Sequence, residues 1–262
     1  MRWHVGIAAV VTATLAVVVS VANRPFRRRV GDGPGPECVL PPRGCSGAHC
    51  AELVQIPVVG AGYVDGRLAN EQTAETSTSY LRRDLIMLVQ YAAAKVACKS
   101  AGWNTGTGGP IVLSDMSERD GSTPGTLWGA PRHPMHTHRN GQDIDIAYFQ
   151  QGSGDNQLRP ICRHRSAAGV DEHRCLAPPE RLDAWRTALF IGAMLEEPRI
   201  RVIGIDGAAA PPILGAFKEL CETGWISSWA CRPERIAFET QSTGRGWFRG
   251  HHNHLHVSLS PP

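Results

Sequence analysis

Residues 138–146, HRNGQDIDI, and residues 251–259, HHNHLHVSL, decide the fold of this chain. In the second stretch, apolar residues alternate with His254, His256 and a serine, which is the period-2 pattern of a strand with one buried face. Both histidines therefore project from the same side, with Cβ atoms roughly 6 to 7 Å apart at a rise of about 3.3 Å per residue. In the first stretch, Asp145 alternates with isoleucines in the same way. We expect Asp145 to face the site while the isoleucines face the core.

The polar side chains of these two stretches suit a metal ion. Catalytic zinc keeps three protein ligands drawn from His, Asp, Glu or Cys and leaves a further position for water. His138, Asp145 and His256 meet that requirement, and Asn140-Gly141 is a turn dipeptide that lets the first two side chains reach one ion. The alternative interpretation is a solvated histidine-rich terminus with carboxylates on the surface. Apolar alternation in both stretches favours the metal site.

The order and spacing of these motifs resemble a known group of zinc peptidases. A His-x6-Asp element that begins His-x-x-Gly and ends Asp-x-Asp is followed about a hundred residues later by His-x-His on a terminal strand. This pattern is similar to that of lysostaphin, the D-Ala-D-Ala metallopeptidases and the hedgehog domain, and within that group it most resembles the penicillin-insensitive murein endopeptidases. The segments that carry the resemblance, spread over about residues 54–260, are 60–63, 113–117, 138–146, 197–200 and 247–256.

The resemblance implies a zinc-dependent endopeptidase that hydrolyses peptide cross-links of bacterial cell-wall peptidoglycan and is insensitive to penicillin. It implies that His138, Asp145 and His256 hold Zn²⁺, which polarises the scissile carbonyl and lowers the pKa of its bound water toward about 7. His254 then acts as general base or hydrogen-bonds the developing oxyanion, and His251 contacts the substrate. The partners implied are the peptide stems of peptidoglycan.

The histidines just upstream of His138 depart from the family pattern. The family usually has a second histidine three residues before its ligand, where this chain has Met135. His136 and His133 are the two candidates to take its place, and the sequence does not decide between them.

Two other functions stay open at this point. One is a carboxypeptidase or dipeptidase on the same scaffold that releases terminal D-Ala instead of cutting a cross-link. The other is a non-catalytic, zinc-stabilised binding module. Retention of His254 beside His256 argues against the module, because a purely structural zinc is closed by a fourth protein ligand.

The N-terminal part of the chain differs from the rest. Residues 5–22 are an apolar run of eighteen, typical of a signal peptide or an uncleaved membrane anchor, which we assign to residues 1–30. Arginines directly after the run oppose export by the positive-inside rule, whereas the cysteines and the expected chemistry favour the periplasm or cell envelope. Residues 31–50 form a Pro/Gly/Cys-rich linker, and residues 51–262 the zinc peptidase domain.

Length and charge limit the alternatives further. A chain of 262 residues suits a leader followed by one domain of about 200 residues, which can bury a sizeable core. The net charge of +3 is too balanced to indicate nucleic acid as a partner.

The chain has eight cysteines, and an even number behind an export leader indicates disulfides. We expect Cys162 to pair with Cys175 and Cys221 with Cys231, because each pair brackets a short polar or Pro/Gly-containing segment. A zinc ribbon is a poor alternative, since Cys-x-x-Cys does not occur in the sequence.

Hydrophobic periodicity predicts an α+β fold. Apolar residues recur every three or four positions in 79–101 and again in 179–196, which indicates two amphipathic helices, and 211–222 is a third candidate. Residues 111–115 and 199–205 read as strands. We therefore expect a small, mainly antiparallel sheet that carries the zinc site on one face, with helices packed on the other.

Residues 150–179 are polar and irregular and contain His164, Asp171, Glu172 and His173. These side chains could form an accessory metal site. We favour a solvated insertion held by a disulfide and leave them out of the predicted site.

Overall fold

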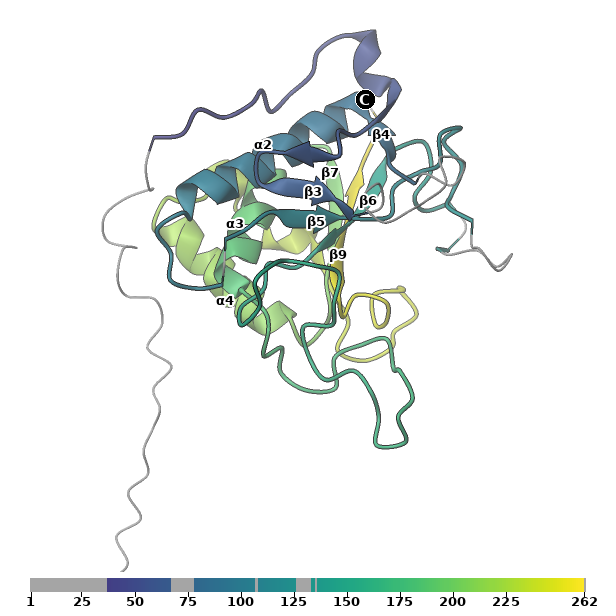
Figure 1. Cartoon of the computed structure of the whole chain (residues 1–262), viewed down its shortest axis with the longest axis vertical. Helices are drawn as coiled ribbons and strands as arrows, with labels where there is room; N and C mark the ends of the chain where they lie inside the picture. Colours follow the sequence, from purple (N-terminus) through teal and green to yellow (C-terminus); the bar gives the residue numbers. More distant parts are fainter. Residues whose placement is uncertain (1–36, 67–77, 107, 126–132, 135, 262) are drawn as a thin grey trace, which may run out of the picture.

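A computed structural model describes residues 37–66, 78–106, 108–125, 133–134 and 136–261. The centre of the protein is a seven-stranded sheet with the strand order β2-β3-β5-β6-β9-β7-β8 (Figure 1). Its strands are β2 (Val59–Gly60), β3 (Tyr63–Asp65), β5 (Ile111–Leu113), β6 (Asp143–Ala147), β9 (His254–Leu259), β7 (Ile200–Gly204) and β8 (Ile236–Ala237). A two-stranded sheet pairs β1 (Leu53–Gln55) with β4 (Tyr80–Arg82).

The seven-stranded sheet is mixed. Four neighbouring pairs are antiparallel, and two pairs, β3 with β5 and β7 with β8, are parallel. Helix α2 (Arg83–Lys99) lies between the first parallel pair in sequence and helix α4 (Ala210–Glu222) between the second, and such crossovers return the chain in its original direction. The predicted α+β class is confirmed, but the sheet is larger and more mixed than expected.

In the described part of the chain, three α-helices match the three predicted from periodicity. Helices α2 and α3 are shorter than predicted, whereas α4 begins one residue earlier. Helix α2 starts at Arg83 because residues 80–82 pair with β1 as a strand. Helix α3 (Ala184–Met194) starts after Asp183, whose side chain accepts a hydrogen bond from the Arg186 backbone nitrogen at 3.1 Å. The described residues also form three short 3₁₀ helices: η2 (Ala48–Ala51), η4 (Ser228–Ala230) and η5 (Pro233–Arg235).

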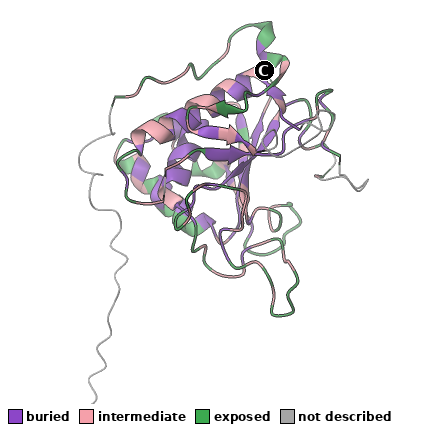
Figure 2. Cartoon of the chain, viewed as in Figure 1, coloured by how far each residue is buried: buried purple, intermediate pink, exposed green. Residues whose placement is uncertain are grey.

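The apolar core lies between the helices and the sheet. Helix α3 packs against both α2 and α4, and buried residues concentrate along these helices and the central strands (Figure 2). In β6 and β9 the apolar residues Ile144, Ile146, Leu255 and Val257 belong to this core. Because side chains alternate along a strand, the polar residues of both strands lie on the opposite face of the sheet.

Four disulfides stabilise the described chain. The predicted pairs Cys162–Cys175 and Cys221–Cys231 are both confirmed. The other two, Cys38–Cys98 and Cys45–Cys50, involve the predicted linker. The first of these joins that segment covalently to α2.

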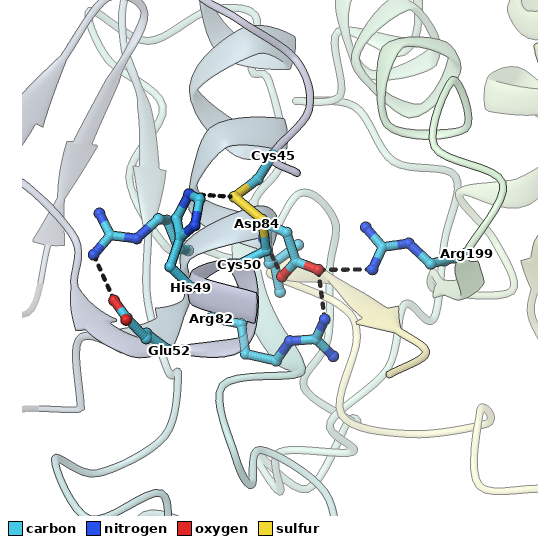
Figure 3. Close-up of a disulfide and its surroundings, with 9 residues drawn as sticks. Cys45, His49, Cys50, Glu52, Arg82, Asp84 and Arg199 are labelled. Atoms are coloured by element: carbon cyan, nitrogen blue, oxygen red, sulfur yellow. Dashed lines mark hydrogen bonds and ion pairs between the residues drawn. A yellow bond between two sulfur atoms is a disulfide. The ribbon is translucent and has the colours of Figure 1, made fainter. Parts of the chain in front are cut away.

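The surroundings of the Cys45–Cys50 disulfide show how the start of α2 is held (Figure 3). Asp84, in the first turn of α2, pairs with Arg82 and with Arg199, at 2.5 and 2.8 Å. A carboxylate is favourable there because the amino end of a helix carries partial positive charge. The same contacts join α2 to the residue preceding β7.

The disulfides also indicate the compartment. Such bonds form and persist in oxidising environments, so four of them are typical of an exported protein. Within the described ranges, no helix combines the length and the apolar character needed to cross a bilayer. The predicted signal peptide or anchor, residues 1–30, lies outside the described part of the chain.

Candidate metal centre

The two stretches that decide the fold are neighbouring antiparallel strands. Strands β6 and β9 pair with Asp145 directly opposite His256 and with Ala147 opposite His254. Asp145 lies two residues from Ala147, and His256 two from His254, so this register puts the carboxylate and both imidazoles on one face.

Asp145 is the centre of the cluster. Its Oδ1 atom lies 3.4 Å from His138 Nε2 and 3.0 Å from His256 Nδ1, and its Oδ2 atom lies 3.4 Å from His254 Nε2. Asp145 is 3% exposed, so these contacts occur out of contact with bulk water. The structure thus brings together all three of the predicted ligands and the predicted general base.

His138 is positioned by a tight turn that precedes β6. His138, Asn140 and Gly141 all have positive φ angles, of 51°, 54° and 64°. At Gly141 a Cβ atom would lie 2.3 Å from the backbone nitrogen of Arg82, so only glycine fits there. The turn passes directly over β4, to which Gly141 is hydrogen-bonded.

The backbone fixes which nitrogen of His138 faces Asp145. His138 Nδ1 lies 3.0 Å from the carbonyl oxygen of Asp115, and a carbonyl can only accept, so Nδ1 carries the proton. His138 Nε2 is then the unprotonated nitrogen, and it is buried without a hydrogen-bond partner. An imidazole held in this way by a backbone carbonyl is a common arrangement for a metal-ligating histidine.

His133, and not His136, lies beside the cluster. The His133 ring stacks on His138 with 3.8 Å between centroids, and His133 Nε2 lies 2.8 Å from Asp115 Oδ2. Potential ligand atoms of His133, His138 and Asp145 all lie within 4.8 Å of one another. His136 is exposed and its Nδ1 lies 3.0 Å from the Arg139 guanidinium, so of the two candidates left open by the sequence, His133 is the one that contacts the cluster.

Asp143 and Asp115 also belong to the centre, although sequence reasoning gave neither a role. Asp143 Oδ1 lies 3.3 Å from His256 Nε2 and is buried without a hydrogen-bond partner. Asp143 shares a face with Asp145 in the alternation of β6, and that signal was available. Asp115 gave a weaker signal. It follows β5 by two residues, and its contact with His138 depends on how distant segments pack together.

His251 lies at the edge of this group. Its ring centroid is 5.5 Å from that of His254 and 5.3 Å from that of Trp247, and the Trp247 ring lies 6.0 Å from His256. The backbone carbonyl of His251 accepts a hydrogen bond of 3.0 Å from the Tyr148 hydroxyl. His251, the histidine predicted to contact substrate, is therefore adjacent to the predicted base His254 and to the Trp247 ring.

Burial and mutual contacts separate the pKa values of these groups. Burial by itself raises the pKa of Asp145, but the neighbouring histidines outweigh it and hold that pKa well below its usual range. Burial lowers the pKa of His256, yet the adjacent carboxylates of Asp143 and Asp145 outweigh this and raise it to about 9. Burial lowers the pKa of His254, and it lowers that of His251 to about 3. At neutral pH Asp145 is thus ionised, His256 carries a proton, and His254 and His251 are neutral.

The residues present fit a metal ion. Two buried polar atoms without hydrogen-bond partners, His138 Nε2 and Asp143 Oδ1, are an exception to the usual pairing of buried polar groups. Both are atoms that ligate metals, and both lie within 3.4 Å of another ligating side chain. Imidazole nitrogen with carboxylate oxygen is a donor set suited to zinc and to several other divalent transition metals.

A second group that could hold a metal is formed by His164, Asp171 and His252. His164 Nδ1 lies 3.1 Å from Asp171 Oδ1, and the rings of His164 and His252 are 5.0 Å apart. The Nδ1 atoms of both histidines are buried without a hydrogen-bond partner. Residues 150–179 contain no helix or strand, as expected. They nevertheless contact the segment just before β9, because the His164 ring lies beside that of His252 and the Ile161 backbone nitrogen donates to the His252 carbonyl oxygen, so the insertion is more than a solvated loop. A third group contains Cys45 and Cys50, whose sulfurs are already joined in a disulfide.

Comparison with protein-family models finds no match to this chain, and comparison with curated proteins finds none either.

Proposed function

We propose that this chain is a zinc-dependent endopeptidase that hydrolyses peptide cross-links in bacterial cell-wall peptidoglycan. The observation that carries the proposal is the contact of one buried carboxylate, Asp145, with three histidines from a turn and a neighbouring strand. Such a cluster of imidazoles around a carboxylate supports metal-assisted hydrolysis better than a structural role, because one of the imidazoles is not needed as a ligand.

His138, Asp145 and His256 are the proposed ligands. When bound, a zinc ion supplies Lewis-acid polarisation of the scissile carbonyl and activates water at neutral pH. Asp115 orients His138 through its backbone carbonyl, and Asp143 orients His256 through its carboxylate. His256 must release the proton that it carries in the metal-free chain before it can act as a ligand.

His254 is the proposed general base. Its lowered pKa keeps the imidazole neutral near pH 7, so that it can accept a proton from the attacking water. Its ring is partly exposed and close to Asp145, which puts the accepting nitrogen beside the ligands without making it one of them. His251, also neutral, and Trp247 form the adjacent wall and would contact the substrate.

His133 is a further ligand candidate that the sequence did not resolve. Its Nδ1 atom lies 4.0 Å from Asp145 Oδ2, and its other nitrogen is held by Asp115. We propose that His133 supplements the ligand set in the place of the upstream histidine of the family that this chain resembles. The four disulfides support an exported location, where peptidoglycan is found.

Incubation of the zinc-loaded chain with purified peptidoglycan tests the proposal. Mass spectrometry of the released fragments should show cross-linked dimers converted to monomers, with benzylpenicillin having no effect and a chelator stopping the reaction. Loss of one alanine from uncross-linked stems would instead identify a carboxypeptidase. Failure of the zinc-loaded chain to change any fragment would contradict the enzymatic reading.

A further inference from the structure

An apolar hollow lies between the end of the 150–179 insertion and the start of α4. It has a volume of about 760 Å³ and is bounded by residues 174–179 and the start of α4, which contribute Pro178, Pro179, Pro211 and Pro212. A smaller cavity of about 140 Å³ adjoins it and is lined by Asp206, Glu239 and Phe248. Arg174, Cys175 and Ala208 line both spaces, so Arg174 lies where the two meet.

Arg174 has donors that the described protein does not use. Its guanidinium carbon lies 4.9 Å from the centroid of the Phe248 ring, and its Nε atom is buried without a hydrogen-bond partner. Within the described ranges, no carboxylate lies within ion-pair distance of Arg174, although many other arginines have such a partner. A buried guanidinium donor without an acceptor is costly, and an anionic ligand would supply that acceptor.

The two carboxylates of the smaller cavity are already occupied by other donors. Asp206 accepts hydrogen bonds from the backbone nitrogens of Cys175 and Ala208, at 2.9 and 2.8 Å. Glu239 accepts from the backbone nitrogens of Thr243 and Trp247, at 2.8 and 2.7 Å. These bonds fix the carboxylates in place and leave the charge of Arg174 available. The nearby negative charges favour a ligand with a single charge over one with two.

The hollow is held rigidly. The Cys162–Cys175 disulfide and the bond from Cys175 to Asp206 fix the backbone next to Arg174. Proline rings have a restricted φ, so the apolar walls lose little conformational freedom when a ligand binds. Arg174 is linked to the surroundings of the metal centre through neighbouring aromatic residues: its guanidinium carbon lies 4.9 Å from the Phe248 ring, and Phe248 follows Trp247, whose ring lies 6.0 Å from that of His256.

We infer that Arg174 anchors a carboxylate of a peptide ligand, and that the proline-lined hollow takes the residues next to that carboxylate. The planar guanidinium fork matches a carboxylate in geometry, and the apolar walls suit small aliphatic side chains. The inference rests on the proposed function, because the peptide stems of peptidoglycan provide the free carboxylates. It adds a specificity site to that function: substrates with a free carboxylate at this position bind best.

Calorimetric titration of the zinc-loaded full chain tests the anchor. The probe is an acetylated tripeptide ending in D-alanyl-D-alanine, offered as the free acid and as the C-terminal amide, and its integrity after titration is checked by mass. We expect the acid to bind at least about tenfold more tightly than the amide, as expected for a charge-assisted hydrogen bond. Arg174→Met should reduce binding of the acid to the level of the amide, and Arg174→Lys should retain part of the preference.

Arg165→Met is the matched control, because it removes the same charge from an exposed position in the same disulfide-closed loop. It should keep the preference for the acid, and thermal unfolding with a thiol assay checks that every variant is folded and oxidised. Equal binding of acid and amide by the unaltered chain would overturn the anchor, as would an acid preference that survives Arg174→Met. Displacement of the peptide by an equimolar amount of inorganic phosphate would overturn the assignment to a carboxylate.

The outcomes also separate the anchor from the proposed function. Cleavage of cross-links combined with an acid preference that ignores Arg174 would refute the anchor alone. An acid preference that depends on Arg174, in a chain that cuts no peptidoglycan, would retain the anchor and refute the hydrolase.

Discussion

Raising the pH above neutrality should destabilise the metal-free chain, because it removes a proton from His256. Burial alone would lower the pKa of this imidazole, but the adjacent carboxylates of Asp143 and Asp145 raise it from 6.5 to about 9. In the unfolded chain the same group titrates near 6.5. The raised pKa therefore contributes stability that is fully present below pH about 6.5 and is lost as the pH rises through about 9. Each pH unit is worth about 1.4 kcal/mol, so the total loss is roughly 3 kcal/mol.

The other groups of the cluster should not obscure this effect. Burial lowers the pKa values of His254 and His251, so both titrate below the range of interest. The pKa values of Asp143 and Asp145 are lowered from 3.8 and change the charge only in acid. Between pH about 6.5 and 9, the slope of stability against pH thus reports mainly on His256.

Urea unfolding in the presence of a chelator, with the disulfides intact, measures this slope. The free energy of unfolding should fall by roughly 3 kcal/mol between pH about 6.5 and 9.5. His256→Gln should be less stable but nearly independent of pH over that range, and the comparison uses slopes because the substitution itself perturbs the core. A stability for the unaltered chain that stays constant or rises over the range would refute the placement of a protonated imidazole between two carboxylates.

Three further predictions concern the frame and the edge of the centre. Replacing Cys38 and Cys98 with alanine removes a disulfide with a sequence separation of 60. The free energy of unfolding, measured in denaturant, should fall by about 4 kcal/mol by the chain-entropy model. An unchanged midpoint would contradict this and would mean that other contacts hold the segment. Gly141→Ala should lower the free energy of unfolding by about 1 to 3 kcal/mol and reduce the zinc content, because its φ is +64° and the added methyl group would collide with the backbone of β4. A fully stable variant would contradict this turn geometry. His133→Ala should weaken zinc binding in a competition titration without abolishing it, and unchanged affinity would remove this residue from the ligand set.

Alternation within the two decisive stretches was enough to predict the faces of β6 and β9. Asp145 and His256 each alternate with core residues, so their common face followed from the period of a strand. The register that puts them directly opposite each other depends on the whole sheet, and the sequence does not contain it. Local pattern thus predicted that Asp145 and His256 share a face, and the fold determined how they meet.

The features that sequence reasoning missed depend on contacts between distant segments. Cys38 pairs with Cys98 across 60 residues, and nothing local links them. Asp115 reaches His138 through a backbone carbonyl, a group that carries no residue-specific signal. The choice of His133 over His136 follows from the course of the loop before the turn, which spacing does not specify.

The start of α2 illustrates a different limit. Apolar periodicity continued from Ser79, but residues 80–82 form β4 because β1 offers a partner for their backbone. Tertiary pairing outweighed helical propensity over these residues. Such a competition is decided by a strand some 27 residues upstream, since Leu53 pairs with Arg82 and Gln55 with Tyr80.

The metal content of two variants on one strand tests the central claim most directly. Purified His256→Ala and His254→Ala, loaded with zinc under identical conditions, are compared with the unaltered chain by elemental analysis and by peptidoglycan hydrolysis. His256→Ala should lose one equivalent of zinc and all activity, because it removes a ligand. His254→Ala should retain the zinc content of the unaltered chain while turnover falls by at least about 10²-fold, because it removes only the base. Loss of zinc by His254→Ala with retention by His256→Ala would reverse the two roles, and zinc and full activity in both variants would contradict the metallopeptidase itself.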